Sequence, residues 1–279
     1  GVKMPAEKVE PLIDTTRAGG VVSYSAAVKV AAPAVVNIFT TQKVKQLNHP
    51  LLNDPVFREF FGNQVPQQPQ NENSLGSGVI VRADGYILTN NHVIAQAEHI
   101  VVALHDGRRA EAKVIGTDPD TDLAVIKIEL DKLPVLPFKL SGNEVGDVVL
   151  AIGNPFGVGQ TVTQGIISAT GRSDLGINTY EDFIQTDAAI NPGNSGGALI
   201  DVAGNLIGVN TAIFSQSGGS LGIGFAIPAN VCQQVLNSIL KDGRVVRGWL
   251  GISLIPNTVE QDVLAAKSVG VVVADVLRG

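Results

Sequence analysis

Cysteine is nearly absent from this chain of 279 residues, which contains only Cys232. A single cysteine excludes an intrachain disulfide and a cysteine-based metal site, and we predict neither a metal nor a cofactor. Cys232 itself is expected to be a small buried hydrophobe on a helix. Packing alone must therefore hold the fold together.

Positive charge and long apolar runs are also scarce. The formal net charge is -6 at pH 7, and no basic cluster is interleaved with the few aromatic residues. Nucleic acid is therefore not an expected partner. No apolar run reaches the roughly 18 residues that span a bilayer, and the N-terminus lacks a signal-peptide pattern. We expect a soluble chain, with a membrane anchor only in a longer full-length protein.

Glycine, by contrast, is abundant, and it surrounds one serine in Gly193-Asn194-Ser195-Gly196-Gly197. Glycines let consecutive backbone N–H groups converge where a tetrahedral oxyanion would form, a conformation that a Cβ would obstruct. The segment fits both the G-x-S-x-G elbow of α/β-hydrolases and the nucleophile loop of double-barrel serine proteases. Ser195 is thus a candidate nucleophile in either fold.

Only four histidines could serve as its base, and all four precede Ser195: His49, His92, His99 and His105. The α/β-hydrolase order of serine, acid, histidine is therefore excluded. The subtilisin order of acid, histidine, serine remains formally possible with Asp54 or Asp84 as the acid. That order belongs to a fold with a parallel βαβ sheet, so the predicted pattern of strands decides whether the subtilisin architecture is possible here.

Short strand-like runs with glycine turns and no intervening helices fill most of the chain. We predict a first set at residues 34–39, 79–81, 86–89, 100–104, 110–115 and 123–128. Pro134 and Pro137 mark a boundary, and a second set follows at residues 148–152, 162–169, 198–201, 206–213 and 222–227. This pattern predicts an all-β fold of antiparallel barrels and disfavours the subtilisin architecture.

The remaining segments are leaders, loops and helices. Residues 1–20 are predicted to be a flexible leader, and Ser23 to cap a short helix through Ala32 that Pro33 stops. A long loop is expected at residues 41–74, where Phe57, Phe60 and Phe61 could form a protein contact or be buried within the chain. An amphipathic helix is expected at residues 229–241, with Asn230 as N-cap and Gly243 as C-terminal stop.

His92 and Asp122 complete a catalytic triad in the order that double-barrel proteases use. His92 follows a predicted strand in Thr89-Asn90-Asn91-His92-Val93, and Asp122 lies in Thr121-Asp122-Leu123-Ala124-Val125. His99 and His105 compete for the role of base but lack the preceding Thr-Asn-Asn context. Ser195 would attack a peptide carbonyl, His92 would transfer the proton, and Asp122 would orient the imidazole.

Two further parts of the site can be assigned. The N–H groups of Gly193 and Ser195 would receive the oxyanion, since Pro192 has no N–H. Apolar residues are expected to line the substrate pocket, namely Ala189, Ile190, Ala212 and Ile213. A pocket without charge should not desolvate lysine or arginine, so we expect cleavage after small aliphatic residues.

The three catalytic segments resemble those of the HtrA (Deg) serine proteases, and most nearly the DegS/AlgW type. The resemblance runs from about Ser23 to Val273. It implies two six-stranded barrels of the chymotrypsin kind followed by PDZ domains, trimeric assembly, and ATP-independent cleavage of polypeptides in the periplasm. It also implies a protease domain at residues 21–245, with barrels at about 33–135 and 138–228 and a helix at 229–242, and a truncated PDZ start at 246–279.

The same resemblance implies regulation by peptide C-termini that bind the PDZ domain. Arg172 and Tyr180 would relay that signal to the oxyanion loop, and Phe156 would be a receiving contact. The segment from Arg247 to Ile252 resembles the carboxylate-binding loop of a PDZ domain and its first strand. The chain ends at Gly279, before such a domain would be complete.

The sequence therefore favours a serine endopeptidase in envelope stress response or quality control. Two alternatives remain. One is a chaperone-like binder of unfolded polypeptides whose catalytic site rests in an inactive state, and the other is a pure PDZ interaction protein, against which the truncated tail argues.

Overall fold

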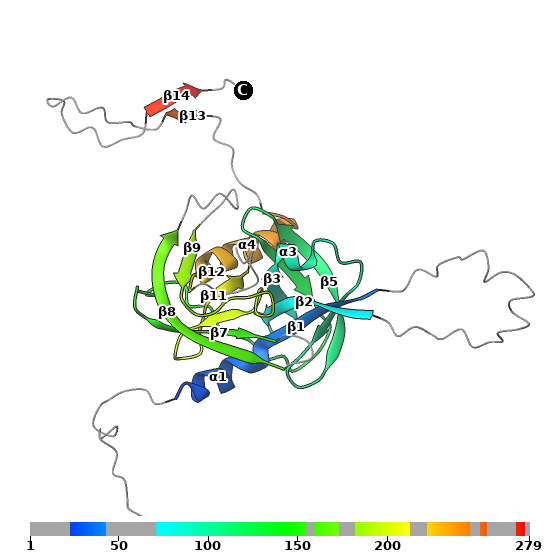
Figure 1. Ribbon diagram of the computed structural model, residues 1–279. Coiled ribbons are helices and arrows are strands. Elements are labelled where there is room, and N and C mark those ends of the chain that lie inside the picture. Colours follow the sequence, from blue (N-terminus) through cyan, green and yellow to red (C-terminus); the bar gives the residue numbers. More distant parts are fainter. Residues whose placement is uncertain are drawn as a thin grey trace, which may run out of the picture. The chain divides into compact units, whose positions relative to one another are not determined.

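The computed structural model describes residues 23–42, 71–154, 159–172, 182–212 and 222–245, together with the backbone of two later strands (Figure 1). The chain divides into two compact units, Gly1–Arg244 and Val245–Gly279. The predicted leader, the three phenylalanines at 57, 60 and 61, and His49 lie outside the described residues.

The first barrel is closed by six antiparallel strands in the order β1-β2-β3-β6-β5-β4. Their bounds are Val35–Gln42 (β1), Asn71–Ile80 (β2), Tyr86–Asn90 (β3), Ile100–Ala103 (β4), Arg109–Asp118 (β5) and Leu123–Lys127 (β6). Residues 35–39 of β1 and 87–88 of β3 are almost all buried apolar side chains. The predicted loop at 41–74 was too long at both ends, because β1 and β2 pair as far as Gln42 and Asn71.

The second barrel has the equivalent order, β7-β8-β9-β12-β11-β10. Its strands are Val148–Gly153 (β7), Thr161–Arg172 (β8), Phe183–Thr186 (β9), Ala198–Ile200 (β10), Leu206–Thr211 (β11) and Gly224–Pro228 (β12). The prediction of two six-stranded antiparallel barrels is confirmed. Strand β9 was missed in the sequence, although it completes the barrel by pairing with both β8 and β12.

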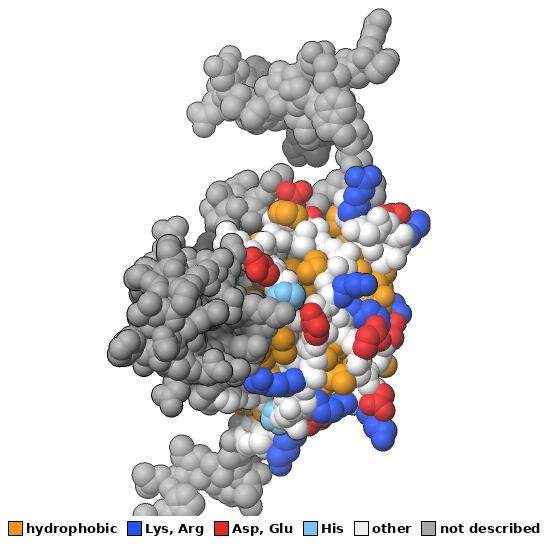
Figure 2. Space-filling model, turned by 90° about the vertical axis from the view of Figure 1, so that its right-hand side faces the viewer, with side chains coloured by type: hydrophobic (Ala, Val, Ile, Leu, Met, Phe, Trp, Pro, Cys, Tyr) orange, Lys and Arg blue, Asp and Glu red, His pale blue; other side chains and the backbone are white. Residues whose placement is uncertain are grey.

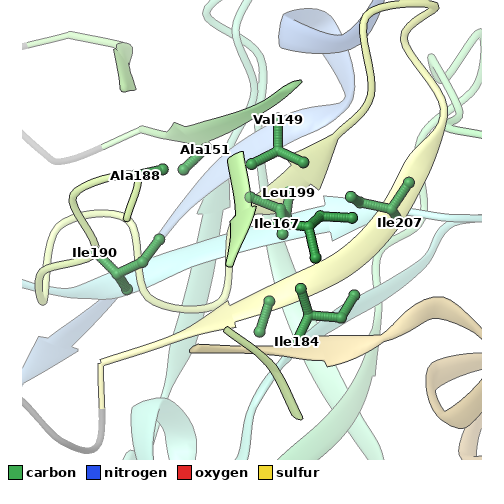
Figure 3. Close-up of a cluster of buried hydrophobic side chains, with 9 residues drawn as sticks. Val149, Ala151, Ile167, Ile184, Ala188, Ile190, Leu199 and Ile207 are labelled. Carbon is green, nitrogen blue, oxygen red and sulfur yellow. The ribbon is translucent and has the colours of Figure 1, made fainter. Parts of the chain in front are cut away.

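A cluster of buried side chains fills the second barrel (Figure 3). It draws Val149 and Ala151 from β7, Ile167 from β8 and Ile184 from β9, together with side chains from β10, β11 and β12. Ala188 and Ile190 join it from the loop after β9. The loop that leads to Ser195 is therefore anchored in the barrel core at its beginning.

The N-caps of two helices differ from those predicted. Helix α1 is Ser25–Ala31, with Tyr24 at its N-cap position, and Pro33 lies in the 3-10 helix Ala32–Ala34 that follows it. Ser23 accepts the N–H of Ser25 at 3.2 Å but is one residue too early to be the cap. The C-terminal helix α4, Ala229–Asp242, follows β12 directly, so Pro228 and not Asn230 is its N-cap. Gly243 ends α4 in a left-handed conformation, as expected.

Helix α4 contacts strands of both barrels. Its neighbours are β11 and β12 in the second barrel and β5 and β6 in the first. Gly116 in β5 makes this approach possible, because a Cβ there would lie 2.6 Å from the Cγ2 atom of Ile239 in α4. The helix therefore packs against both barrels and connects them.

The second unit contains an antiparallel pair of strands, Ile252–Ile255 (β13) and Val272–Val276 (β14). Its interpretation as the start of a PDZ domain remains a prediction.

Candidate active site

The predicted base and acid come from neighbouring turns of the first barrel. Strand β3 ends at Asn90, and His92 lies in the short helix α3, Asn91–Ile94, that follows it. Asp122 lies in the turn before β6, the strand that pairs with β3. The Nδ1 atom of His92 is 2.6 Å from Oδ2 of Asp122, and the His92 backbone N–H donates to Oδ1 at 2.9 Å. The carboxylate thus holds both the ring and the backbone of the histidine.

Asp122 is itself fixed by its surroundings. It is buried and has a left-handed backbone with φ 57°, which aspartate tolerates better than most residues. Its carbonyl accepts the backbone N–H of Asn91 at 3.0 Å, and its Oδ2 atom accepts the hydroxyl of Thr211 at 3.2 Å. Thr211 belongs to β11, so the second barrel also holds the acid.

The candidate nucleophile lies in the turn between β9 and β10. The carbonyl of Ser195 accepts the N–H of Ser77 from β2 at 2.9 Å, and the N–H of Gly196 donates to the carbonyl of Asn210 in β11 at 2.8 Å. Gly196 has φ +83°, and a Cβ at this position would overlap the carbonyl oxygen of Ser77. Only glycine therefore fits directly after the serine.

The structure brings the three predicted catalytic residues together. The Oγ atom of Ser195 is 3.2 Å from Nε2 of His92. It is also 2.7 Å from Oδ1 of Asn90 and 3.1 Å from the backbone N of Ala212. The contact with Asn90 was not predicted, since the sequence analysis used this residue only as context for His92.

The two N–H groups predicted to receive an oxyanion both donate within their own loop. The N–H of Gly193 donates to Oδ1 of Asn191 at 3.0 Å, and the N–H of Ser195 donates to the carbonyl of Asn191 at 3.1 Å. The N–H of Asn194 shares this carbonyl, so the turn has the geometry of a single helical turn. Gly193 has no left-handed φ, and its carbonyl accepts the hydroxyl of Ser77 at 2.9 Å.

The predicted pocket residues divide into a core member and two partly exposed ones. Ile190 is buried, and it fills the space beside Gly224, where a Cβ would lie 2.6 Å from the Cγ1 atom of Ile190. Ala189 and Ala212 are partly exposed. The carbonyl of Ala189 accepts hydrogen bonds from the side chains of Thr163 and Asn194, both at 2.9 Å. Ile213 lies outside the described residues.

Other candidates from the sequence lie away from Ser195 or cannot be placed. The ring of His99 is 3.6 Å from the carboxylate of Glu111 at the surface, and His105 is exposed in a turn. Of the predicted relay residues, Tyr180 and Phe156 lie outside the described residues, while Arg172 ends β8 opposite Phe183. His92 is thus the histidine that serves this site.

On the face shown in Figure 2, basic and acidic side chains are interspersed, without an extended patch of one sign. In the part of the chain that the structure describes, no three His, Cys, Asp or Glu residues are grouped so that they could hold a metal ion. No helix among the described residues is long and apolar enough to cross a membrane.

Comparison with known proteins decides the family. A sequence profile of the trypsin-like peptidase domain matches residues 76–209. The solved structure of the HtrA-type protease AlgW with a decapeptide is 60% identical, covers 92% of this chain and 80% of that one, and superposes with a TM-score of 0.79. The chain belongs to the HtrA-type serine proteases.

Other HtrA-type relatives agree with this assignment. A probable periplasmic DegP-like serine endoprotease of Chlamydia pneumoniae is 48% identical over 279 residues, which cover 92% of this chain and 56% of the relative. The serine endoprotease from Yersinia pestis is 46% identical, covers 84% of this chain and 73% of that one, and has a TM-score of 0.64. The chain spans about half the length of the curated relatives that it matches. The resemblance of the catalytic segments to HtrA proteases is therefore confirmed.

Proposed function

We propose that this HtrA-type chain is a serine endopeptidase that cleaves polypeptides. The observation that carries the proposal is the hydrogen-bonded series Asp122, His92 and Ser195, which is assembled from both barrels. Oγ of Ser195 attacks the peptide carbonyl and its proton passes to Nε2 of His92. The same proton then goes to the leaving amine, and water repeats the cycle on the acyl-enzyme. Asp122 stabilises the imidazolium that forms in between.

The oxyanion loop must rearrange for this reaction. A developing oxyanion needs N–H donors about 2.7–3.1 Å away, but those of Gly193 and Ser195 are engaged with Asn191. We propose that the peptide between Pro192 and Gly193 turns over in the active state, which glycine permits at low cost. The geometry described above is then the resting state of the site.

Turnover of unfolded casein, compared between the wild type and Ser195→Ala, tests the enzymatic proposal. We expect cleavage products from the wild type and none from the variant. The resting geometry also supports a second function, in which the chain binds unfolded polypeptides without cutting them. Equal survival of casein in both proteins, together with suppressed aggregation, would favour that second function.

We propose that substrates are cut after small aliphatic residues such as valine or alanine. The support is Ile190, whose side chain occupies the space beside Gly224 and lies among apolar neighbours. A peptide library should show cleavage after valine and alanine, and Ile190→Ala should extend cleavage to larger residues such as leucine. Preferential cleavage after arginine would contradict the proposal.

The setting of this activity is also a proposal. Curated relatives are named probable periplasmic serine endoproteases, which supports a periplasmic location. We propose in addition a role in protein quality control or envelope stress response. We further propose that the full-length protein forms a homotrimer and that peptide C-termini bind its PDZ region. Arg172, Tyr180 and Phe156 would then relay that binding to the oxyanion loop. Cell fractionation and light scattering of the full-length protein test the location and the trimer.

A further inference from the structure

The hydroxyl of Ser195 has one proton and two acceptors within reach. Oδ1 of Asn90 is 2.7 Å from Oγ, whereas Nε2 of His92 is 3.2 Å away. A serine hydroxyl donates only once, so it can serve one of these acceptors at a time. The shorter distance favours Asn90 as the acceptor of this proton. The N–H of Ala212 donates to Oγ at 3.1 Å and occupies one of its lone pairs.

The amide of Asn90 is locked in the orientation that this contact needs. Asn90 is fully buried at the end of β3, and its Nδ2 group donates to the carbonyl of Asp122 at 3.2 Å. Because Nδ2 is held by that carbonyl, the amide oxygen must face Ser195. The backbone of the catalytic acid therefore sets the orientation of the group that faces the nucleophile.

We propose that Asn90 is a positioning residue that holds the hydroxyl proton of Ser195 away from His92 until substrate engages the site. The proposal rests on the endopeptidase function proposed above. With the O–H directed to Asn90, Nε2 of His92 receives no proton from serine and cannot act as its base. Activation then requires the O–H to rotate from Asn90 to His92, without breaking any covalent bond.

This arrangement occurs together with the closed oxyanion loop. The N–H of Gly193 is satisfied by Asn191, while the hydroxyl of Ser195 is satisfied by Asn90. Asn191 thus accepts the hydrogen bond of a predicted oxyanion donor, and Asn90 accepts the hydrogen bond of the nucleophile. Ser195 is also only 1% exposed, so its hydroxyl is shielded from solvent in the resting site, whereas Gly193 is partly exposed.

The rate at which diisopropyl fluorophosphate modifies Ser195 tests the proposal. In this reaction Oγ forms a bond to phosphorus, fluoride leaves, and the serine proton passes to His92. Asn90→Ala leaves His92 as the only acceptor, and we expect it to react about two- to tenfold faster than the wild type, the range that one such hydrogen bond gives. A rate at or below that of the wild type, with an unchanged melting temperature, would overturn the proposal.

Two variants serve as controls. Asn90→Asp retains an oxygen acceptor for the hydroxyl, so its rate should not exceed that of the wild type. Asn143→Ala alters a partly exposed asparagine in the segment before β7 and should leave the rate unchanged. If no protein modifies at Ser195, the endopeptidase function itself fails, whereas equal modification of all four proteins refutes only the role of Asn90.

A second measurement does not depend on the stability of Asn90→Ala. The ¹⁵N resonance of Nε2 of neutral His92 reports whether the serine donates to it. If Asn90 holds the proton, Ser195→Ala should leave this resonance nearly unchanged. A clear shift on removal of the hydroxyl would show that serine donates to His92 at rest and would refute the proposal.

Discussion

The two barrels share one strand order but hold their catalytic residues in different ways. In the first barrel, His92 and Asp122 lie beside the paired strands β3 and β6 and are joined by two hydrogen bonds. In the second, Ser195 lies in a turn whose N–H groups donate to Asn191 within the same turn. The same topology thus places the acid and base beside paired strands in one barrel and the nucleophile in a turn that hydrogen-bonds to itself in the other.

The difference follows from where backbone hydrogen bonds are made. The turn of Asp122 is held by a neighbouring strand end, by Asn91 and by Thr211 of the other barrel. In the turn at 191–194 the N–H groups of Gly193 and Asn194 donate to Asn191, and the carbonyl of Gly193 accepts the hydroxyl of Ser77 from the first barrel. The proposed turning of the Pro192–Gly193 peptide would change these hydrogen bonds and leave those between His92 and Asp122 in place.

The largest expected effect comes from the fixed side of the site. Asp122→Asn keeps a residue that tolerates the left-handed backbone but removes the charge that stabilises the imidazolium. We expect kcat for a peptide substrate to fall about 10⁴-fold, as loss of this charge does in serine proteases generally. Asp120→Asn in the same turn is the control and should retain full activity. Activity of Asp122→Asn within tenfold of the wild type would show that the acid is dispensable.

The next effect concerns the anchor of the nucleophile turn. Gly196→Ala combines a left-handed backbone with overlap at the carbonyl of Ser77, so we expect a loss of about 2–5 kcal/mol in the free energy of unfolding. Gly107→Ala has φ +90° but open space around it, and should lose only about 1–2 kcal/mol. Urea denaturation of both variants measures the difference. Equal losses would mean that the contact with Ser77 does not matter.

A smaller effect is expected where α4 joins the barrels. Gly116→Ala places a methyl group against Ile239 and should cost about 1–3 kcal/mol. The loss in stability of the double variant Gly116→Ala/Ile239→Ala should be smaller than the sum of the two single losses, because Ile239→Ala makes room for the added methyl group. Calorimetry of the single and double variants checks this. Strict additivity would argue against a direct contact.

The smallest expected effect is on the pH dependence of stability, and it is tested at two aspartates, one in a turn of each barrel. Burial acts to raise the pKa of Asp201, but hydrogen bonds from Asn205 and Ala203 and the charge of Lys139 lower it overall. A carboxyl whose pKa is lowered on folding stabilises the protein above its unfolded pKa of about 3.9, and this contribution is lost as pH falls through the folded value. Asp201→Asn should therefore cost about 1 kcal/mol at pH 7 and nothing at the acidic end of the curve.

The exposed counterpart of Asp201 in the first barrel is Asp106. Its pKa is also lowered, first by the backbone N–H of Arg108 and then by that residue's side chain. Asp106→Asn should change stability less than Asp201→Asn at pH 7, because solvent screens the exposed pair. Melting curves between pH 3 and pH 7 distinguish the two turns. A larger effect at Asp106 would contradict the role given to burial.

The strands and the triad could be predicted from sequence because both leave local signals. Alternating or buried runs marked most strands, and His92, Asp122 and Ser195 each lie beside one. Strand β9 was missed because two of its four residues, Gln185 and Thr186, are polar, whereas the equally short β4 and β10 are wholly apolar. The first residue of α4 was predicted correctly, but its N-cap was misassigned because Pro228 both ends a strand and serves as N-cap.

The role of Asn90 could not be predicted, because it depends on a contact between residues 105 positions apart. Asn191 was missed for a different reason, because its side chain and carbonyl accept the N–H groups of Gly193 and Ser195 within the same turn. The composition of the turn does not reveal which way these N–H groups point, whereas the contact of Asn90 exists only once the two barrels have closed against each other. The sequence therefore indicated His92, Asp122 and Ser195, but not the hydrogen bonds that Asn90 and Asn191 make to the site.

The pairing of β1 with β2 determines how the length of the segment between them affects the stability of the fold. The two strands continue as a ribbon to Gln42 and Asn71, beyond the stretch where β4 borders β1. Whatever joins them is thus closed at its base by backbone hydrogen bonds. Each doubling of such a connection adds only about 0.6 kcal/mol of closure entropy. A change in the number of residues between Gln42 and Asn71 should therefore cost the fold little closure entropy.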